Sequence, residues 1–256
     1  MLRNFRRTNQ AFFLLVFFWL FLQTESKGAD ELGYPVKVFL DAVPLLWLSI
    51  ALATRSFDHF LSLALFVAIA TVLLGRVFCG WVCPLGTLND LAGRFATRRS
   101  APLGWFRLKY MILFFLLAAS LFTFQPTGLL DPLSLTIRSL ALSLYPACSR
   151  VISAPFDAIY AAHLPVLTDA SEAVYGFLRG AVLPFRPPMF RQAFMLGMLF
   201  CGIVALNLVE RRFWCRYLCP LGALLGILSR RSLLRRSVSE GCSDCGACTS
   251  ACRGGG

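Results

Sequence analysis

One short cysteine pattern occurs twice in the chain, and this repetition restricts the folds that the chain can adopt. The pattern reads C-x3-C-P-L-G, and a basic and an aromatic residue precede both copies. The first copy contains Cys79 and Cys83, and the second contains Cys215 and Cys219. Each copy follows an apolar stretch, and each stretch follows a segment that contains Asp and Pro. The sequence therefore predicts two similar halves whose cysteine pairs meet on one face, as in parallel repeats.

The composition is unusually apolar for a chain of this length. Hydrophobic residues make up 57% of the sequence and charged residues 15%, whereas charged residues are about 25% of an average soluble domain. This balance excludes an ordinary soluble enzyme, a disordered protein and a nucleic-acid-binding protein, although the net charge is +12. It predicts an integral membrane protein that has lipid as a neighbour and no nucleic-acid partner.

Four apolar stretches are predicted to cross a bilayer, which requires about 20 mostly apolar residues. Two other apolar stretches contain Asp and Pro, which are unfavourable within a membrane, and are predicted to be re-entrant or interfacial. The first stretch is interpreted as an uncleaved anchor, with a signal-like segment as the alternative. The four predicted spans are 10–22, 57–77, 108–124 and 190–209, and the two other stretches are 36–53 and 129–145.

The distribution of charge predicts the orientation of these spans. Most basic residues fall on one side if both termini and the 90–109 loop are cytoplasmic, as the positive-inside rule requires. The predicted fold class is an all-α integral membrane protein with two pseudo-repeats and a small C-terminal ferredoxin-like segment. The predicted units are an N-terminal anchor (1–34), two membrane repeats (35–107 and 108–236) and the iron–sulfur segment (237–256).

The paired cysteines suit a metal or redox role. Side chains at i and i+4 of a helix lie about 5–6 Å apart at Cβ, and the proline after the second cysteine disfavours helix there. Each pair is therefore expected at the end of a helix, and two such ends bring together Cys79, Cys83, Cys215 and Cys219. Four thiolates fit zinc or an iron–sulfur cluster. The alternatives are redox-active thiols and small buried cysteines that only pack.

The most specific motif is near the C-terminus. Cys242, Cys245, Cys248 and Cys252 have the C-x2-C-x2-C-x3-C spacing of bacterial ferredoxins, which predicts a [4Fe–4S] cluster. Zinc is the alternative, but zinc sites usually separate two C-x2-C pairs by a longer spacer. In two-cluster ferredoxins the fourth cysteine serves the other cluster, and no second run follows here. Either Cys252 completes its own cluster or another residue does, and we expect the ferredoxin segment to continue past residue 256.

With these motifs the chain resembles the membrane-bound polyferredoxin-like family typified by NapH and the C-terminal half of NosR. The resemblance covers residues 35 to 252 apart from an insertion at 145–189, and its motifs are specific to the family rather than to one member. It implies a multi-pass protein of the bacterial inner membrane with cytoplasmic [4Fe–4S] clusters. Members usually carry two ferredoxin runs and this chain shows one, so the resemblance implies one cluster and leaves room for a second.

The resemblance also implies a function in electron transfer between the quinone pool and a partner redox system. The chain would then be an electron-transfer subunit, for example of a quinol dehydrogenase, with a quinone or quinol and a redox protein as partners. Two alternatives use the same thiols. One is a maturation or assembly factor for a metal centre, and the other is a non-catalytic membrane anchor.

Overall fold

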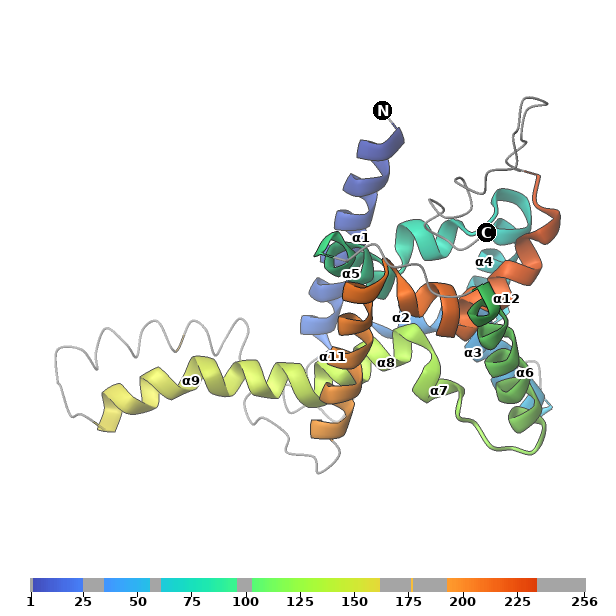
Figure 1. The fold of residues 1–256 in the computed structure, drawn as a ribbon. Coiled ribbons are helices and arrows are strands. Elements are labelled where there is room, and N and C mark those ends of the chain that lie inside the picture. Colours follow the sequence, from blue (N-terminus) through green and yellow to red (C-terminus); the bar gives the residue numbers. More distant parts are fainter. Residues whose placement is uncertain are drawn as a thin grey trace.

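The computed structural model describes residues 2–24, 35–55, 61–95, 103–161, 176 and 193–233, and these ranges are mainly helical (Figure 1). The α-helices are α1 (Leu2–Gln23), α2 (Lys37–Asp41), α3 (Pro44–Thr54), α4 (Leu61–Leu74), α5 (Pro84–Ala92), α6 (Leu108–Leu121), α7 (Thr127–Leu130), α8 (Pro132–Ser139), α9 (Tyr145–Ala161), α11 (Ala193–Val209) and α12 (Pro220–Leu228). Three π-helical turns are η1 (Phe78–Val82), η4 (Leu140–Leu144) and η5 (Trp214–Leu218). The 3₁₀ turns are η2 (Gly93–Phe95), η3 (Leu103–Arg107) and η6 (Ser229–Arg231).

Prolines determine where several helices start. Pro44, Pro84, Pro132 and Pro220 each begin a helix. This placement is favourable because the first helical position needs no N–H donor, and the fixed φ of proline suits a helix. At α8 the side chain of Asp131 adds a cap, since its Oδ2 accepts hydrogen bonds from the backbone N–H groups of residues 133 and 134 at 3.1 and 3.0 Å. The Asp/Pro segments are therefore places where one helix ends and another starts.

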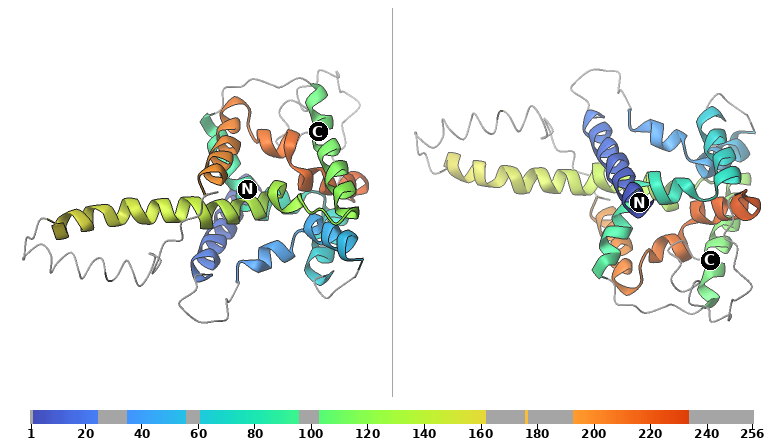
Figure 2. Two further views of the ribbon diagram at one scale, coloured as in Figure 1. Left: turned by 90° about the horizontal axis from the view of Figure 1, so that it is seen from below. Right: turned by 90° about the horizontal axis from the view of Figure 1, so that it is seen from above.

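The two halves of the chain are interleaved. Helix α5 of the first half packs against α11 of the second, and α12 of the second half packs against α3, α4 and α6. Helix α1 lies against η1 and α5. Helix α9 points away from this assembly in every view (Figures 1 and 2). Because each half packs on the other, both cysteine turns face the centre of the helical body.

A single apolar cluster lies between the interleaved helices. Its fully buried members come from both halves, and packing of this kind excludes water from the neighbouring cysteine turns. They include Leu45, Leu85, Leu133, Leu221 and Leu225.

The prediction of a multi-pass membrane protein is wrong. Helices do occupy the four apolar stretches, but α4 and α6 have 14 residues each and α11 has 17. At about 1.5 Å per residue a 14-residue helix is about 21 Å long, short of the roughly 30 Å hydrocarbon core. Helix α1 has 22 residues, but its first turns carry Arg3, Arg6 and Arg7. Throughout the ranges given above, no helix is both long enough and apolar enough to span a bilayer.

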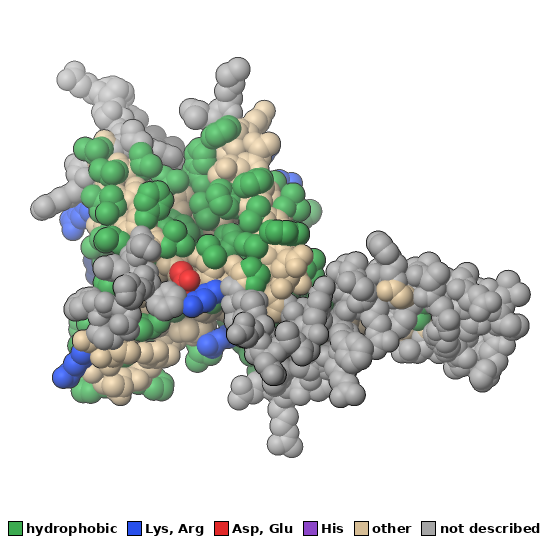
Figure 3. Space-filling model, turned by 180° about the vertical axis from the view of Figure 1, so that it is seen from behind, with side chains coloured by type: hydrophobic (Ala, Val, Ile, Leu, Met, Phe, Trp, Pro, Cys, Tyr) green, Lys and Arg blue, Asp and Glu red, His purple; other side chains and the backbone are tan. Residues whose placement is uncertain are grey.

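The predicted multi-pass location in the bacterial inner membrane fails on the same finding, and so does the assignment of cytoplasmic termini that depended on it. The helices nevertheless expose many large apolar side chains, and Figure 3 shows them over a large part of one face. Large exposed apolar patches are typical of surfaces that contact another protein or a lipid. Examples are Phe66 on α4, Phe114 and Phe115 on α6, and Phe194 and Met195 on α11.

Candidate functional site

Both cysteine pairs lie on the same unusual backbone turn. The first pair spans the π-helical turn η1, which the bond from the Cys83 N–H to the Phe78 carbonyl closes at 3.0 Å. The second pair spans η5, which the bond from the Cys219 N–H to the Trp214 carbonyl closes at 2.9 Å. The expected helix end at each second cysteine is present, but the turn before it is a π-turn rather than an α-turn. Single π-turns are frequent at functional sites.

The second cysteine of each pair begins the next helix. Cys83 and Cys219 both have extended backbone, with ψ of 117° and 112°, and occupy the N-cap positions of α5 and α12. The sulfur of Cys219 accepts a hydrogen bond from the backbone N–H of Gly222 at 3.3 Å. In the first half, Gly86 is the residue that matches Gly222. Its backbone N–H lowers the pKa of Cys83 and so opposes the rise caused by burial. A thiol thus takes the capping role that a hydroxyl or carboxylate usually has.

The glycine of each C-P-L-G motif permits a close backbone approach. A Cβ on Gly86 would lie 2.8 Å from the carbonyl oxygen of Cys79, closer than packed atoms can approach. A Cβ on Gly222 would lie 3.4 Å from the carbonyl oxygen of Cys215. Glycine at this position therefore lets the start of the helix pack against the π-turn. The requirement is stricter at Gly86 than at Gly222, because the approach is closer at Gly86.

The four paired cysteines lie close enough to one another to interact electrostatically. Burial raises the pKa of all four thiols, that of Cys79 to about 12. The charge of Cys215 raises the pKa of Cys79 further, and the pKa of Cys219 is raised by all three other thiols, so the four are electrostatic neighbours. All four are free thiols. Cys79 and Cys215 are partly exposed, whereas Cys83 and Cys219 are buried.

The paired cysteines are candidate ligands for a second cluster. Within the part of the chain that the structure describes, no three His, Cys, Asp or Glu side chains are grouped so that they could hold a metal ion. A [4Fe–4S] cluster needs four protein ligands, usually thiolates. Both predicted roles of the four paired cysteines, as ligands of a second cluster and as redox thiols, stay predictions.

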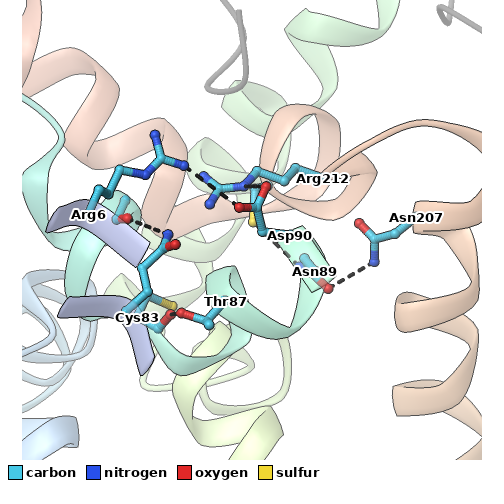
Figure 4. Close-up of polar contacts among 10 residues, drawn as sticks. Arg6, Cys83, Thr87, Asn89, Asp90, Asn207 and Arg212 are labelled. Carbon is cyan, nitrogen blue, oxygen red and sulfur yellow. Dashed lines mark hydrogen bonds and ion pairs between the residues drawn. The ribbon is translucent and has the colours of Figure 1, made fainter. Parts of the chain in front are cut away.

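Basic side chains surround the thiols. Arg76 and Arg212 lower the pKa of Cys79, in opposition to burial. Arg212 is 6% exposed, has a left-handed φ of 59°, and forms an ion pair with Asp90 at 3.4 Å. Arg6 of α1 approaches the same carboxylate at 3.8 Å (Figure 4). The pKa of Lys109 is lowered, chiefly by burial, and Cys219 is among the groups that oppose this change.

Two buried amides lie beside the thiols. Asn89 of α5 and Asn207 of α11 are both fully buried, and the Asn207 amide donates to Asn89 Oδ1 at 2.9 Å (Figure 4). Asn89 Nδ2 in turn donates to the sulfur of Cys215 at 3.5 Å. The sequence analysis missed both residues. The available signal was a lone asparagine within the apolar stretch of α11, because a polar side chain in such a place needs a partner.

A second buried polar group lies beside the Cys215–Cys219 turn. Glu210 accepts hydrogen bonds from Arg216 and, at 2.8 Å, from the hydroxyl of Tyr217. The Arg216 guanidinium also lies over the rings of Phe106 and Tyr217, at 5.4 and 5.6 Å from their centroids. The charge is therefore held by a carboxylate and two aromatic faces, which fixes the π-turn that carries Cys215.

The predicted cluster ligands Cys242, Cys245, Cys248 and Cys252 lie outside the described residues. Their donor chemistry fits an iron–sulfur cluster, because four thiols in the ferredoxin spacing are its usual ligands.

Comparison with known proteins places this helical, cysteine-bearing chain among the iron–sulfur proteins. Residues 59–110 and 192–239 match the family described as "4Fe-4S binding domain", and each stretch contains one C-x3-C-P pair. The chain belongs to the ferredoxin-type family that includes NapH, MauN and NosR. The prediction of a [4Fe–4S] cofactor is thereby confirmed.

Relatives in several organisms show similar identity. The methylamine utilization ferredoxin-type protein MauN of Methylorubrum extorquens is 28% identical over 75% of this chain and 52% of its own length. The ferredoxin-type protein NapH of Haemophilus influenzae is 27% identical over 83% of this chain and 63% of its own length. The protein NirI of Paracoccus denitrificans is 33% identical over 73% of this chain and 22% of its own length. The chain thus spans less than two thirds of these relatives, and no solved structure matches it.

Proposed function

We propose that the chain is an iron–sulfur electron-transfer protein with a second redox site formed by its paired thiols. Cys242, Cys245, Cys248 and Cys252 would hold the cluster, and the cluster would supply one-electron transfer. The observation that carries the proposal is the convergence of two identical π-turns, each with one partly exposed and one buried thiol. The exposed thiol can meet a partner, and the buried thiol can complete a disulfide with it.

The paired thiols supply two-electron chemistry. When Cys79 and Cys83 form a disulfide, two S–H bonds break, one S–S bond forms, and two electrons and two protons leave. A quinone that becomes a quinol takes up two electrons and two protons, so the two couples balance. We therefore propose a quinone or quinol as the small-molecule partner of the thiol site, with a separate redox protein as the partner of the cluster.

The residues around the thiols set the conditions for this exchange. Burial holds the thiols protonated at neutral pH, and Arg76 and Arg212 favour the thiolate form that reacts. The thiols are thus mainly protonated at rest, and they react when a partner brings an acceptor for the proton.

We extend the proposal to lipid as a surface neighbour, supported by the exposed apolar side chains of α6 and α11. Flotation of the purified protein with phospholipid vesicles tests this part. Recovery of the protein in the vesicle fraction is expected, and an unchanged sedimentation of the protein would contradict it.

The main experiment measures iron, acid-labile sulfide and free thiols on protein purified without oxygen. One variant replaces the four paired cysteines by serine, a second replaces Cys242 and Cys245, and the control replaces the exposed Cys148 and Cys201. The wild type, the control and the first variant should each contain about four iron atoms, as one cubane requires, and the second variant should lose them.

Menadione and its quinol then test the thiol site in the same proteins. Four thiols in the wild type and in the control should be oxidised by the quinone and recovered with the quinol, and the serine variant should lack this change. Loss of iron from the four-serine variant would make the pairs cluster ligands and overturn the thiol role. No iron in the wild type would overturn the whole proposal.

A further inference from the structure

The hydrogen bond from Asn89 to Cys215 is the one side-chain amide contact to a paired thiol that the described residues show. Asn89 belongs to α5 of the first half, whereas Cys215 belongs to η5 of the second half. The Asn89 side chain is fully buried, and its Nδ2 lies 3.5 Å from the Cys215 sulfur. This polar contact, buried on its Asn89 side, links the two halves at the thiol site.

The direction of this hydrogen bond is set by a chain of amides. The Asn207 Nδ2 donates to the carbonyl oxygens of Ile203 and Val204 in its own helix, both at 3.0 Å, as well as to Asn89 Oδ1. Helix carbonyls accept and cannot donate, so the nitrogen of Asn207 must face them. Asn89 therefore presents its oxygen to Asn207, and its NH₂ group is directed at the sulfur. The Asn207 Oδ1 is left without a partner among the described residues, which shows that the orientation is held against a local penalty.

The repeat provides a natural comparison for this contact. Asn89 is the sixth residue after Cys83, and the sixth residue after Cys219 is Leu225, which is also fully buried. A leucine side chain has no N–H to donate. The two cysteine turns have the same backbone conformation. Cys215 receives a hydrogen bond from a side-chain amide, whereas Cys79 has no amide at the matching position, because that position is Leu225.

A hydrogen bond to sulfur favours the thiolate over the thiol, and the thiolate is the reactive form. The positive charge of Arg212 acts on Cys215 in the same direction, and both oppose the effect of burial on the pKa of this thiol. The groups that act on Cys79 are different, since Arg76 and Arg212 oppose burial there without an amide donor.

We propose that Asn89 is a positioning residue that makes Cys215 the most reactive of the four paired thiols. The two C-x3-C-P pairs are then chemically inequivalent, and an external partner reacts first with the pair of the second half. This inference rests on the proposed function of the pairs as redox thiols.

The test measures the rate at which N-ethylmaleimide alkylates each cysteine in the folded, cluster-containing protein. Timed samples at several pH values from 6 to 9 are quenched and digested, and the modified peptides are quantified by mass spectrometry. In the wild type we expect Cys215 to react at least about tenfold faster than Cys79, because a hydrogen bond to a charged group is worth a factor of this size.

The variant Asn89→Leu copies the residue found at position 225. It should slow Cys215 to the rate of Cys79 and shift its pH profile to higher pH, while the rate at Cys79 stays unchanged. The variant Asn207→Leu should have a smaller effect in the same direction because Asn89 keeps its donor but loses its orienting partner. The control Leu225→Val keeps an apolar side chain at the matching position and should leave both rates unchanged.

Equal rates at Cys215 and Cys79 in the wild type, or an unchanged Cys215 rate in Asn89→Leu, would overturn the inference. Iron content reports whether each variant is intact, and Asn207→Leu provides the test if Asn89→Leu fails to fold. The alkylation rates do not depend on electron transfer. If Cys215 reacts faster than Cys79 but quinone does not oxidise the thiols, the proposed function is wrong and this inference stands. If quinone oxidises the thiols but Cys215 and Cys79 react at equal rates, the proposed function stands and this inference is wrong.

Discussion

The cysteine turn of the first half, η1, and that of the second half, η5, follow the same backbone course but have different polar surroundings. Around η5, Glu210 binds Arg216 and Tyr217, and Asn89 reaches the first cysteine. In the first half the positions that match Glu210 and Arg216 are Leu74 and Gly80. The repeated sequence therefore conserves the geometry of the turn, whereas the individual side chains set its chemistry. A duplicated motif therefore need not have a duplicated function.

The largest expected loss of stability comes from replacing Glu210, beside η5, with leucine, the residue at the matching position 74 of the first half. Glu210→Leu removes the buried carboxylate and leaves the Arg216 guanidinium buried without it, and such a loss costs about 3–5 kcal/mol of unfolding free energy. Urea denaturation followed by circular dichroism measures the change. Gly80→Ala at the position that matches Arg216 is the control, since its added Cβ would meet open space. A change below 1 kcal/mol in Glu210→Leu would show that the pair does not hold the second turn.

Asp131 and Asp41, which precede a proline-initiated helix in each half, offer a comparison in pH dependence. Burial raises the pKa of Asp131 from its ordinary value of 3.8 to about 7, although two backbone N–H groups oppose the change. The unfolded carboxyl ionises near pH 4 and the folded one near pH 7. The wild type should therefore lose stability as the pH rises between these values, by roughly 2–4 kcal/mol relative to Asp131→Asn, which keeps the capping oxygen.

Denaturation of both proteins from pH 4 to pH 8 checks this prediction. Asp41 is partly exposed, and its pKa is raised by burial while Lys37 opposes the rise, so Asp41→Asn should change the pH dependence much less. Parallel stability curves for the wild type and Asp131→Asn would show that the carboxyl ionises normally in the folded protein.

The glycines that follow the two cysteine pairs should differ in their tolerance of a side chain. The Cβ of Gly86→Ala would meet a backbone carbonyl at 2.8 Å, which a rotamer change cannot relieve, so we expect a loss of about 1–3 kcal/mol. The corresponding distance for Gly222→Ala is 3.4 Å, and the loss should be below about 1 kcal/mol. Denaturation of the two variants measures both losses of unfolding free energy. Equal losses would mean that the two cysteine turns pack equally closely against the glycines.

Part of this structure could be predicted from local sequence. The apolar stretches gave the positions of α4, α6 and α11, and the proline after each cysteine pair predicted the helix end at Cys83 and Cys219. The crossing of a bilayer was wrongly predicted because composition reports how apolar a stretch is, whereas spanning depends on how long its helix stays unbroken. The contact of Asn89 with Cys215 could not be predicted, because the two residues are 126 positions apart and meet only through the packing of one half on the other.

The thiol cap of α12 has a mechanical consequence. The Cys219 sulfur accepts a hydrogen bond from a backbone N–H in the first turn of α12. A chemical change at this sulfur therefore alters the acceptor of that N–H group. A thiolate is a better hydrogen-bond acceptor than a thiol or a disulfide sulfur, so the strength of the hydrogen bond at the start of α12 depends on the protonation and oxidation state of Cys219. Since α12 packs against α3, α4 and α6, a chemical change at this one sulfur acts on a helix that three other helices contact.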